Sequence, residues 1–157
     1  MALPRDSKST EGARALLFDR LVDFDPTEPV EQQPLRVLDT NGVRESVQRE
    51  LGRLLNTRSP TQPGELEGRA WTVLDWGLPD YSGWYTLSPP SHLRLSRLIE
   101  AAIRAFEPRM VDPKVSVELS DGNNRSLQVW IEGTIRIGTL LEPVSFPLAL
   151  EARASRR

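Results

Sequence analysis

The sequence is most informative in what it lacks, because its 157 residues include no cysteine, a single histidine and only two lysines. Without cysteine, the chain has no thiolate nucleophile, no cysteine-ligated zinc, no iron–sulfur cluster and no disulfide. The lone histidine, His92, removes most imidazole-based metal sites, which usually need two or three histidines. We therefore expect neither a cofactor nor a metal, and carboxylate chemistry is the only catalytic chemistry still well supplied.

Long apolar runs and an excess of positive charge are also missing. With 22 acidic and 20 basic residues the net charge is −2, and nucleic-acid binding normally needs a basic surface. No window approaches 18 apolar residues, and residues 1–10 contain no apolar core of a signal peptide. We expect a soluble, unexported protein with no nucleic-acid partner, no direct membrane insertion and no small-molecule substrate.

Arginine accounts for nearly all of the basic residues, since Lys8 and Lys114 are the only lysines among them. Arginine binds carboxylates through a planar fork and is favoured at protein contacts. The imbalance reflects either coding bias or interface use, and the composition does not separate the two.

The length fits one domain of ordinary size, which we place at residues 9–151, between a flexible N-terminal tail at 1–8 and a basic C-terminal tail at 152–157. Apolar residues at helical spacing predict three helices, the first capped by Ser9 or Thr10 and ending near Val22. The other two are predicted over residues 41–56 and 91–106.

From Lys114 onward the apolar residues alternate with polar ones, which is typical of strands. The alternation predicts strands over 115–119, 127–137 and 144–150, and Pro147 marks the last one as an edge strand. The predicted fold class is α+β, with N-terminal helices packed on one face of a C-terminal three-stranded antiparallel meander sheet.

The run Glu107-Pro108-Arg109 places a carboxylate and a guanidinium on a rigid turn where the third helix meets the sheet. In one interpretation the proline only stops the helix, and the two charges are solvated or paired locally. In the other, the rigid turn presents both charges to a partner helix with little loss of entropy. The sequence leaves both interpretations open.

Trp130 is a further candidate for partner binding. Its parity in the second strand places it opposite Val129 and Ile131, on the face that carries Gln128 and Glu132. An exposed tryptophan is a favoured anchor at protein interfaces. The alternative is that flanking loops cover this face as well.

Hydrolysis by paired carboxylates needs one carboxyl with a raised pKa in an apolar pocket and a second carboxyl nearby. Glu107 lies two residues from the cation of Arg109, while Glu118 and Glu132 have outward parity on their strands. No Gly-x-Ser-x-Gly motif accompanies His92. We therefore predict no catalytic residues.

Several segments, in order along the chain, resemble the TssE family of gp25-like baseplate wedge subunits of bacterial type VI secretion systems, which are similar to wedge proteins of contractile phage tails. The segments are Leu-Phe-Asp-Arg-Leu at 17–21, Arg-Glu-Ser-Val-Gln-Arg-Glu-Leu at 44–51, Leu-Leu-Asn-Thr-Arg at 54–58, Trp-Gly-Leu-Pro-Asp at 76–80 and Phe-Glu-Pro-Arg at 106–109. The resemblance implies a structural protein of the cytoplasmic baseplate.

The resemblance also implies partners. They are the other wedge subunits, TssF, TssG and TssK, and the sheath proteins TssB and TssC. In this family the Glu-Pro-Arg turn contacts the helical core bundle of the wedge, and the terminal sheet is similar to the strand-exchange domain of the sheath proteins. Partner-binding roles thus fall to Glu107, Pro108 and Arg109, with Trp130 added from its exposure.

The functional hypothesis is docking into the wedge and help in starting sheath assembly, and Arg109→Ala is expected to abolish wedge association while leaving the fold intact. One alternative is a lysozyme-like peptidoglycan hydrolase. Another is an adaptor outside secretion.

Overall fold

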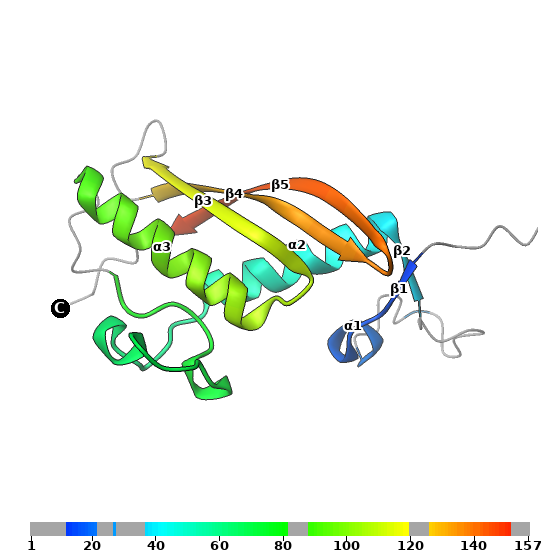
Figure 1. Cartoon of the computed structure of the whole chain (residues 1–157), viewed down its shortest axis with the longest axis horizontal. Helices are drawn as coiled ribbons and strands as arrows, with labels where there is room; N and C mark the ends of the chain where they lie inside the picture. The colour runs from blue at the N-terminus through cyan, green and yellow to red at the C-terminus, as the bar shows by residue number, and fades with distance from the viewer. Residues whose placement is uncertain (1–11, 22–26, 28–36, 82–87, 120–125, 152–157) are drawn as a thin grey trace, which may run out of the picture.

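A three-stranded antiparallel sheet forms the C-terminal half of the computed structural model, which describes residues 12–21, 27, 37–81, 88–119 and 126–151 (Figure 1). Its strands are β3 (Met110–Leu119), β4 (Ser126–Ile137) and β5 (Leu140–Glu151), in the order β3-β4-β5. Along β4 the odd-numbered residues Leu127, Val129, Ile131, Ile135 and Ile137 are buried. The predicted alternation of faces is therefore confirmed, as is the edge position of the strand that contains Pro147.

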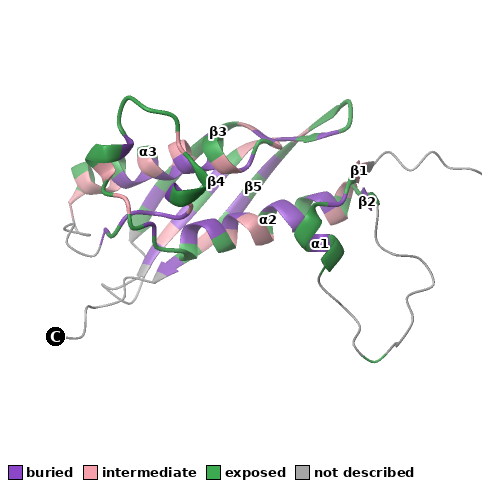
Figure 2. Cartoon of the chain, turned by 90° about the horizontal axis from the view of Figure 1, so that it is seen from below, coloured by how far each residue is buried: buried purple, intermediate pink, exposed green. Residues whose placement is uncertain are grey.

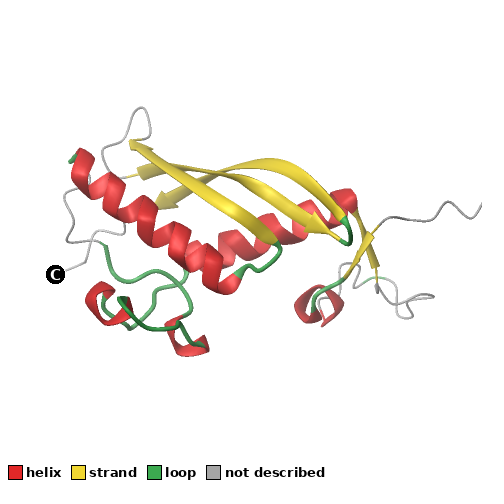
Figure 3. Ribbon diagram, in the orientation of Figure 1, coloured by secondary structure: helices red, strands yellow, loops and turns green. Residues whose placement is uncertain are grey.

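Two long helices, α2 (Thr40–Asn56) and α3 (Pro89–Phe106), lie side by side across one face of this sheet (Figure 3). The α2 side chains that face the core are Val43, Ser46, Val47, Leu51, Leu54 and Leu55. Asp39 caps α2, because its Oδ1 accepts a 2.8 Å hydrogen bond from the Gly42 N–H. Both helices start within two residues of the predicted positions.

The predicted fold is wrong in its N-terminal part, where a helix was expected from residue 9 or 10 to Val22. The structure instead contains a strand, β1 (Gly12–Arg14), paired antiparallel with β2 (Val37–Asp39), and α1 (Leu17–Leu21) is only five residues long. Helical periodicity is a local signal, whereas β1 forms its hydrogen bonds with β2, which is distant in the sequence. The layer over the sheet thus contains two long helices, and the α+β class with a C-terminal sheet still holds.

Strand β3 begins at Met110, earlier than predicted, because a bulge between Val111 and Lys114 interrupts the alternation. Asp112 in this bulge has a φ of +49°, an uncommon value for a residue with a side chain. Opposite the bulge, a Cβ on Gly133 would lie 2.9 Å from the Met110 methyl carbon and 3.1 Å from the Val111 carbonyl oxygen, so a larger residue there would require the Met110 side chain to move.

The segment between α2 and α3 is a loop that contains two short 3₁₀ helices, η1 (Pro63–Leu66) and η2 (Val73–Asp75). It is joined to the end of α2 by two backbone hydrogen bonds, from Ser59 to Leu78 and from Leu78 to Thr57, each 2.9 Å long. Trp71 and Trp76 pack against Phe106 with ring centroids 5.9 and 5.1 Å away. These aromatic contacts join the loop to the end of α3.

Other predictions concern parts of the chain that lie outside the described residues. These are the tails at 1–8 and 152–157, the turn that Asp-Gly-Asn-Asn at 121–124 predicts, and the extended loop that three prolines predict at 23–34, of which only residue 27 is described. Among the described residues no helix is both long enough and apolar enough to cross a membrane.

Candidate functional site: a buried ion cluster and the outer sheet face

The Glu-Pro-Arg turn lies between α3 and β3, as predicted. Glu107 follows the last residue of α3, and its N–H donates to the carbonyl of Ile103 at 2.8 Å. Its own carbonyl accepts from the Met110 N–H at 3.0 Å, which closes the turn around an exposed Pro108. Proline thus ends the helix and fixes the short distance between the charged residues on either side of it.

The side chains of Glu107 and Arg109 bind each other. Arg109 donates from Nε to Oε1 at 2.7 Å and from Nη2 to Oε2 at 2.6 Å, the bidentate arrangement that makes arginine–carboxylate pairs strong. The Arg109 side chain is only 15% exposed and the Glu107 side chain only 5%. The structure therefore turns both charges inward, toward the protein, and leaves Pro108 as the exposed member of the turn.

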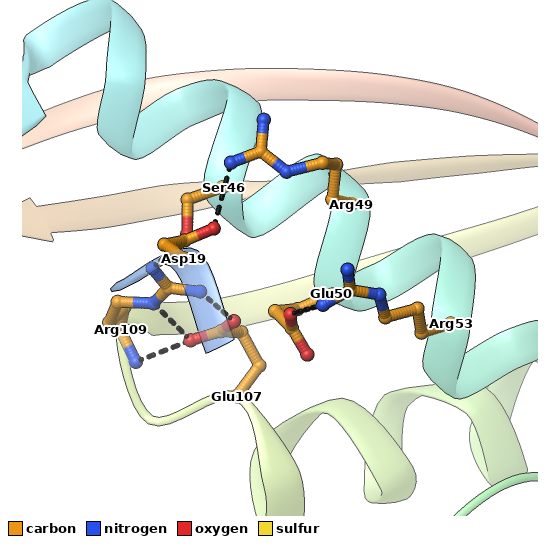
Figure 4. Close-up of polar contacts among 7 residues, drawn as sticks. All are labelled: Asp19, Ser46, Arg49, Glu50, Arg53, Glu107 and Arg109. Carbon is orange, nitrogen blue, oxygen red and sulfur yellow. Dashed lines mark hydrogen bonds and ion pairs between the residues drawn. The ribbon is translucent and has the colours of Figure 1, made fainter. Parts of the chain in front are cut away.

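Helices α1 and α2 complete a cluster around this pair (Figure 4). Arg109 Nη1 donates to Ser46 Oγ at 2.8 Å, and Ser46 Oγ donates to Asp19 Oδ2 at 2.6 Å. The second oxygen of Asp19 accepts from Arg49 Nη2 at 2.8 Å. We call Asp19, Ser46, Arg49, Glu107 and Arg109 the buried ion cluster.

The electrostatics of the buried ion cluster favour the ionised form of Asp19. Burial by itself would raise the pKa of Asp19, but the hydrogen bonds from Ser46 and Arg49 and the charges of Arg49 and Arg109 together lower it. Two carboxylates are thus matched by two guanidinium groups. Among the described residues, no buried side-chain nitrogen or oxygen lacks a hydrogen-bond partner.

Only two members of this cluster, Glu107 and Arg109 on either side of Pro108, were predicted from the sequence. The prediction missed Asp19, Ser46 and Arg49, which come from α1 and α2. One signal was available, because Ser46 lies three residues after Val43 and so falls on the apolar stripe of its helix. A serine in that stripe indicates a polar partner in the interior.

A third buried carboxylate, Asp75, lies in the loop between α2 and α3. Its Oδ1 accepts from Thr61 Oγ1 at 2.8 Å and from Arg69 Nη2 at 2.7 Å, and its Oδ2 accepts from the Thr72 N–H at 2.7 Å. The hydrogen bonds from Arg69 and then from the Thr72 backbone hold the pKa of Asp75 far below its usual value. We call Thr61, Arg69, Thr72 and Asp75 the loop clamp.

Trp130 lies on the face of the sheet away from α2 and α3, and 39% of it is exposed. Its neighbours across the strands are Ser116 on β3 and Pro147 on β5. The structure thus places it apart from the buried ion cluster, which lies among the helices and the turn. Its position agrees with the exposure predicted from parity, and its binding role stays a prediction.

The carboxylates considered for hydrolysis do not form a catalytic pair. Glu107 is neutralised by Arg109, whereas Glu118 and Glu132 are exposed on the outer face of the sheet. Within the described ranges, no group of three histidine, cysteine, aspartate or glutamate side chains could hold a metal ion. What the arrangement does provide is a rigid turn, an exposed sheet face and two outer strands.

Two helices thus cover one face of a small sheet, and the opposite face exposes Trp130 and Glu132. The family model for baseplate wedge protein gp25 matches residues 41–139, which is more than half of the 157-residue chain. The chain therefore belongs to the gp25 baseplate wedge family, a structural component of baseplates. The resemblance to gp25-like wedge subunits is confirmed.

The chain is similar to solved structures. One is a chain of the baseplate complex from the type VI secretion system, at a TM-score of 0.50 and 22% identity, with 71% of this chain and 96% of that chain covered. Another is a candidate tail lysozyme from Geobacter sulfurreducens, at a TM-score of 0.46 and 18% identity, with 71% and 95% covered. No protein with a curated description matches the chain.

Proposed function

We propose that this protein is a TssE-type wedge subunit of a type VI secretion baseplate on the cytoplasmic side of the inner membrane. In this role it docks with TssF, TssG and TssK and helps to start the sheath of TssB and TssC. The observation that carries the proposal is the family match, because residues 41–139 contain both the Glu-Pro-Arg turn and Trp130. The likeness of fold to a type VI baseplate chain supports it.

The proposal gives the protein no enzymatic role. A general acid for glycoside hydrolysis needs a carboxyl whose protonated form is favoured. The buried carboxylate of Asp19 has a lowered pKa, and that of Glu107 is bound in a bidentate pair to Arg109. The lowered pKa of Asp19 favours its charged form, and the Glu107 carboxylate is engaged by Arg109 within the fold.

Wedge docking is tested by co-expression of the full chain with TssF and TssG from the same gene cluster, followed by affinity purification. We expect the chain to co-purify with both subunits. Trp130→Ala should weaken its capture of wedge or sheath subunits by about tenfold, which is typical for an interface tryptophan. Leu93→Ala is the matched control, since Leu93 is a large apolar residue of α3, outside the sheet, that is also exposed. Failure of the unsubstituted chain to bind either wedge subunit would refute the proposed function.

Sheath contact is proposed to use an outer strand of the sheet, either β5 or its counterpart β3, because an open edge can accept an added strand. In β5, Pro143, Ser145 and Pro147 are alternate residues, so their backbone nitrogens point in the same direction. Proline occurs on edge strands with its nitrogen turned away from the neighbouring strand. Ser145 then supplies the one N–H donor among these three positions.

Strand addition at β5 is tested with Ser145→Pro, which removes that donor, and with Ser145→Ala, which keeps it. If the sheath pairs with β5, Ser145→Pro should reduce the amount of TssB–TssC bound to the assembled wedge, and Ser145→Ala should not. Equal binding by both variants would exclude this part of β5 and leave β3 as the edge to test.

A further inference from the structure

Helix α1 exposes three large apolar side chains, although it is held firmly in place. Leu17, Phe18 and Leu21 are 64%, 61% and 68% exposed, and their spacing puts them on one face of the helix. Figure 2 shows α1 as mainly exposed, in contrast to the buried positions along α2. Single exposed apolar residues are common, but three on one helical turn form a patch.

The contact that positions α1 is polar, not apolar. Asp19 is 3% exposed and binds Ser46 and Arg49 of α2. A helix of five residues is too short to be stable by itself, so it is fixed by the buried ion cluster together with the pairing of β1 and β2 that precedes it. The cluster thus orients the apolar side chains of α1 outward in a fixed arrangement, which reduces the entropy lost when a partner binds.

A pocket of about 620 Å³ adjoins this patch and offers a place for partner side chains. It is lined by Phe18 of α1, by Glu50, Arg53 and Thr57 of α2, and by Trp76 of the loop. The guanidinium of Arg53 lies 5.9 Å from the centre of the Phe18 ring. The patch and the pocket therefore form one surface, which we call the α1 surface.

The charges around the α1 surface indicate the chemistry of its partner. The carboxylates of Asp19 and Glu50 are only 3% and 11% exposed, whereas the Arg49 and Arg53 side chains are 36% and 46% exposed. Glu45 is an exposed carboxylate at this rim, at 4.0 Å from Arg49. The cations at the rim are thus more accessible than most of the carboxylates that pair with them.

We infer that the α1 surface binds an amphipathic helix of another wedge subunit, with an apolar stripe flanked by aspartate and glutamate. The stripe covers Leu17, Phe18 and Leu21 and places a side chain in the pocket, while the acidic flanks meet the arginine rim. The inference rests on the proposed function and deepens it. Helix α1 lies outside residues 41–139, so the family match by itself assigns it no role.

The first test replaces the apolar face. Leu17→Ser with Leu21→Ser in the full chain should weaken the capture of co-expressed TssF–TssG by at least about tenfold. The thermal unfolding midpoint should stay close to that of the parent, because both side chains are exposed. Leu93→Ser is the matched control, since Leu93 is an exposed leucine at the other end of the helical layer. Normal capture by the double variant would overturn the inference.

The second test identifies what covers the surface. A photoreactive benzoylphenylalanine in place of Phe18 should crosslink to a helical, acidic-flanked segment of TssF or TssG. Crosslinks to a second copy of this chain, to a basic segment or to nothing would overturn the inference while capture of TssF–TssG upholds the proposed function. If the parent chain binds neither subunit, the proposed function fails and the inference fails with it.

The third test addresses charge. Arg20→Glu reverses an exposed cation of α1 and should reduce capture several-fold at low salt, with a smaller effect at high salt. Arg97→Glu, the same change on the exposed side of α3, should leave capture unchanged. Equal effects of the two reversals would contradict a specific acidic partner at α1.

Discussion

The buried ion cluster and the loop clamp use the same chemistry for different purposes. In the loop clamp, Asp75 binds Arg69 and Thr72, six and three residues away, and Thr61, fourteen residues away. In the buried ion cluster, Asp19 binds Ser46 and Arg49 across 27 and 30 residues, and Ser46 is linked to Arg109 across a further 63.

The difference shows that a buried aspartate can either shape one loop or join separate elements. The loop clamp joins residues of one loop, so its loss should destabilise mainly that loop. The buried ion cluster joins α1, α2 and the turn after α3, so its loss should affect all three of these elements.

Arg109→Ala should lower the free energy of unfolding by about 3 kcal/mol, because it leaves the Glu107 carboxylate buried without its cation. The structure thus changes the sequence-based expectation that this substitution leaves the fold intact. Urea denaturation measures the effect. The paired change Glu107→Gln with Arg109→Met removes both charges and should cost less than Arg109→Ala alone. A loss within about 0.5 kcal/mol for Arg109→Ala would contradict the burial of this pair.

Asp19→Ala should lower the free energy of unfolding by about 1–3 kcal/mol, since it removes the acceptor of the Ser46 and Arg49 hydrogen bonds. Amide hydrogen exchange should speed up in α1 and leave the loop clamp unchanged. Arg20→Ala, an exposed neighbour in the same helix, is the control. Unchanged exchange in α1 would mean that something other than Asp19 holds the helix.

Asp75→Ala should loosen residues 61–76 and leave the exchange of α2 and α3 close to that of the parent. Limited proteolysis should then cut within this loop sooner than elsewhere. Glu67→Ala, an exposed carboxylate of the same loop, serves as the control. A cooperative loss of protection in α2 and α3 would erase the contrast between the two sites.

The lowered pKa values of Asp19 and Asp75 predict how the stability depends on pH in the acidic range, with a smaller effect than that of the substitutions above. The pKa values of Asp19 and Asp75 are lowered in the folded protein, so each ionised carboxylate stabilises the fold at pH values above about 4, the unfolded value. That contribution is lost as the pH falls toward the folded pKa values. Stability measured between about pH 5 and pH 2 should therefore decline less steeply in Asp19→Asn and Asp75→Asn than in the parent. An equal slope in all three proteins would contradict the lowered pKa values.

Much of the fold was predictable because its signals are local. The apolar stripe of α2 and the alternation of β4 place each side chain on a face by spacing alone, and both elements agree with the structure. The N-terminal segment was not predictable in this way. Gly12 pairs with Asp39 and Ala13 with Leu38, so β1 depends on a partner that no local pattern reveals.

The candidate site also has some features that the sequence predicts and others that it does not. The position of the Glu-Pro-Arg turn could be predicted from the sequence, since proline ends α3 and the two charged residues lie two residues apart. The sequence also determined the outward face of Trp130 through strand parity. The inward orientation of Glu107 and Arg109 is visible only in the tertiary structure. The same is true of the hydrogen bonds that Asp19 and Ser46 add to this pair. The physical reason is that buried charges require partners, and here those partners come from helices distant in the sequence.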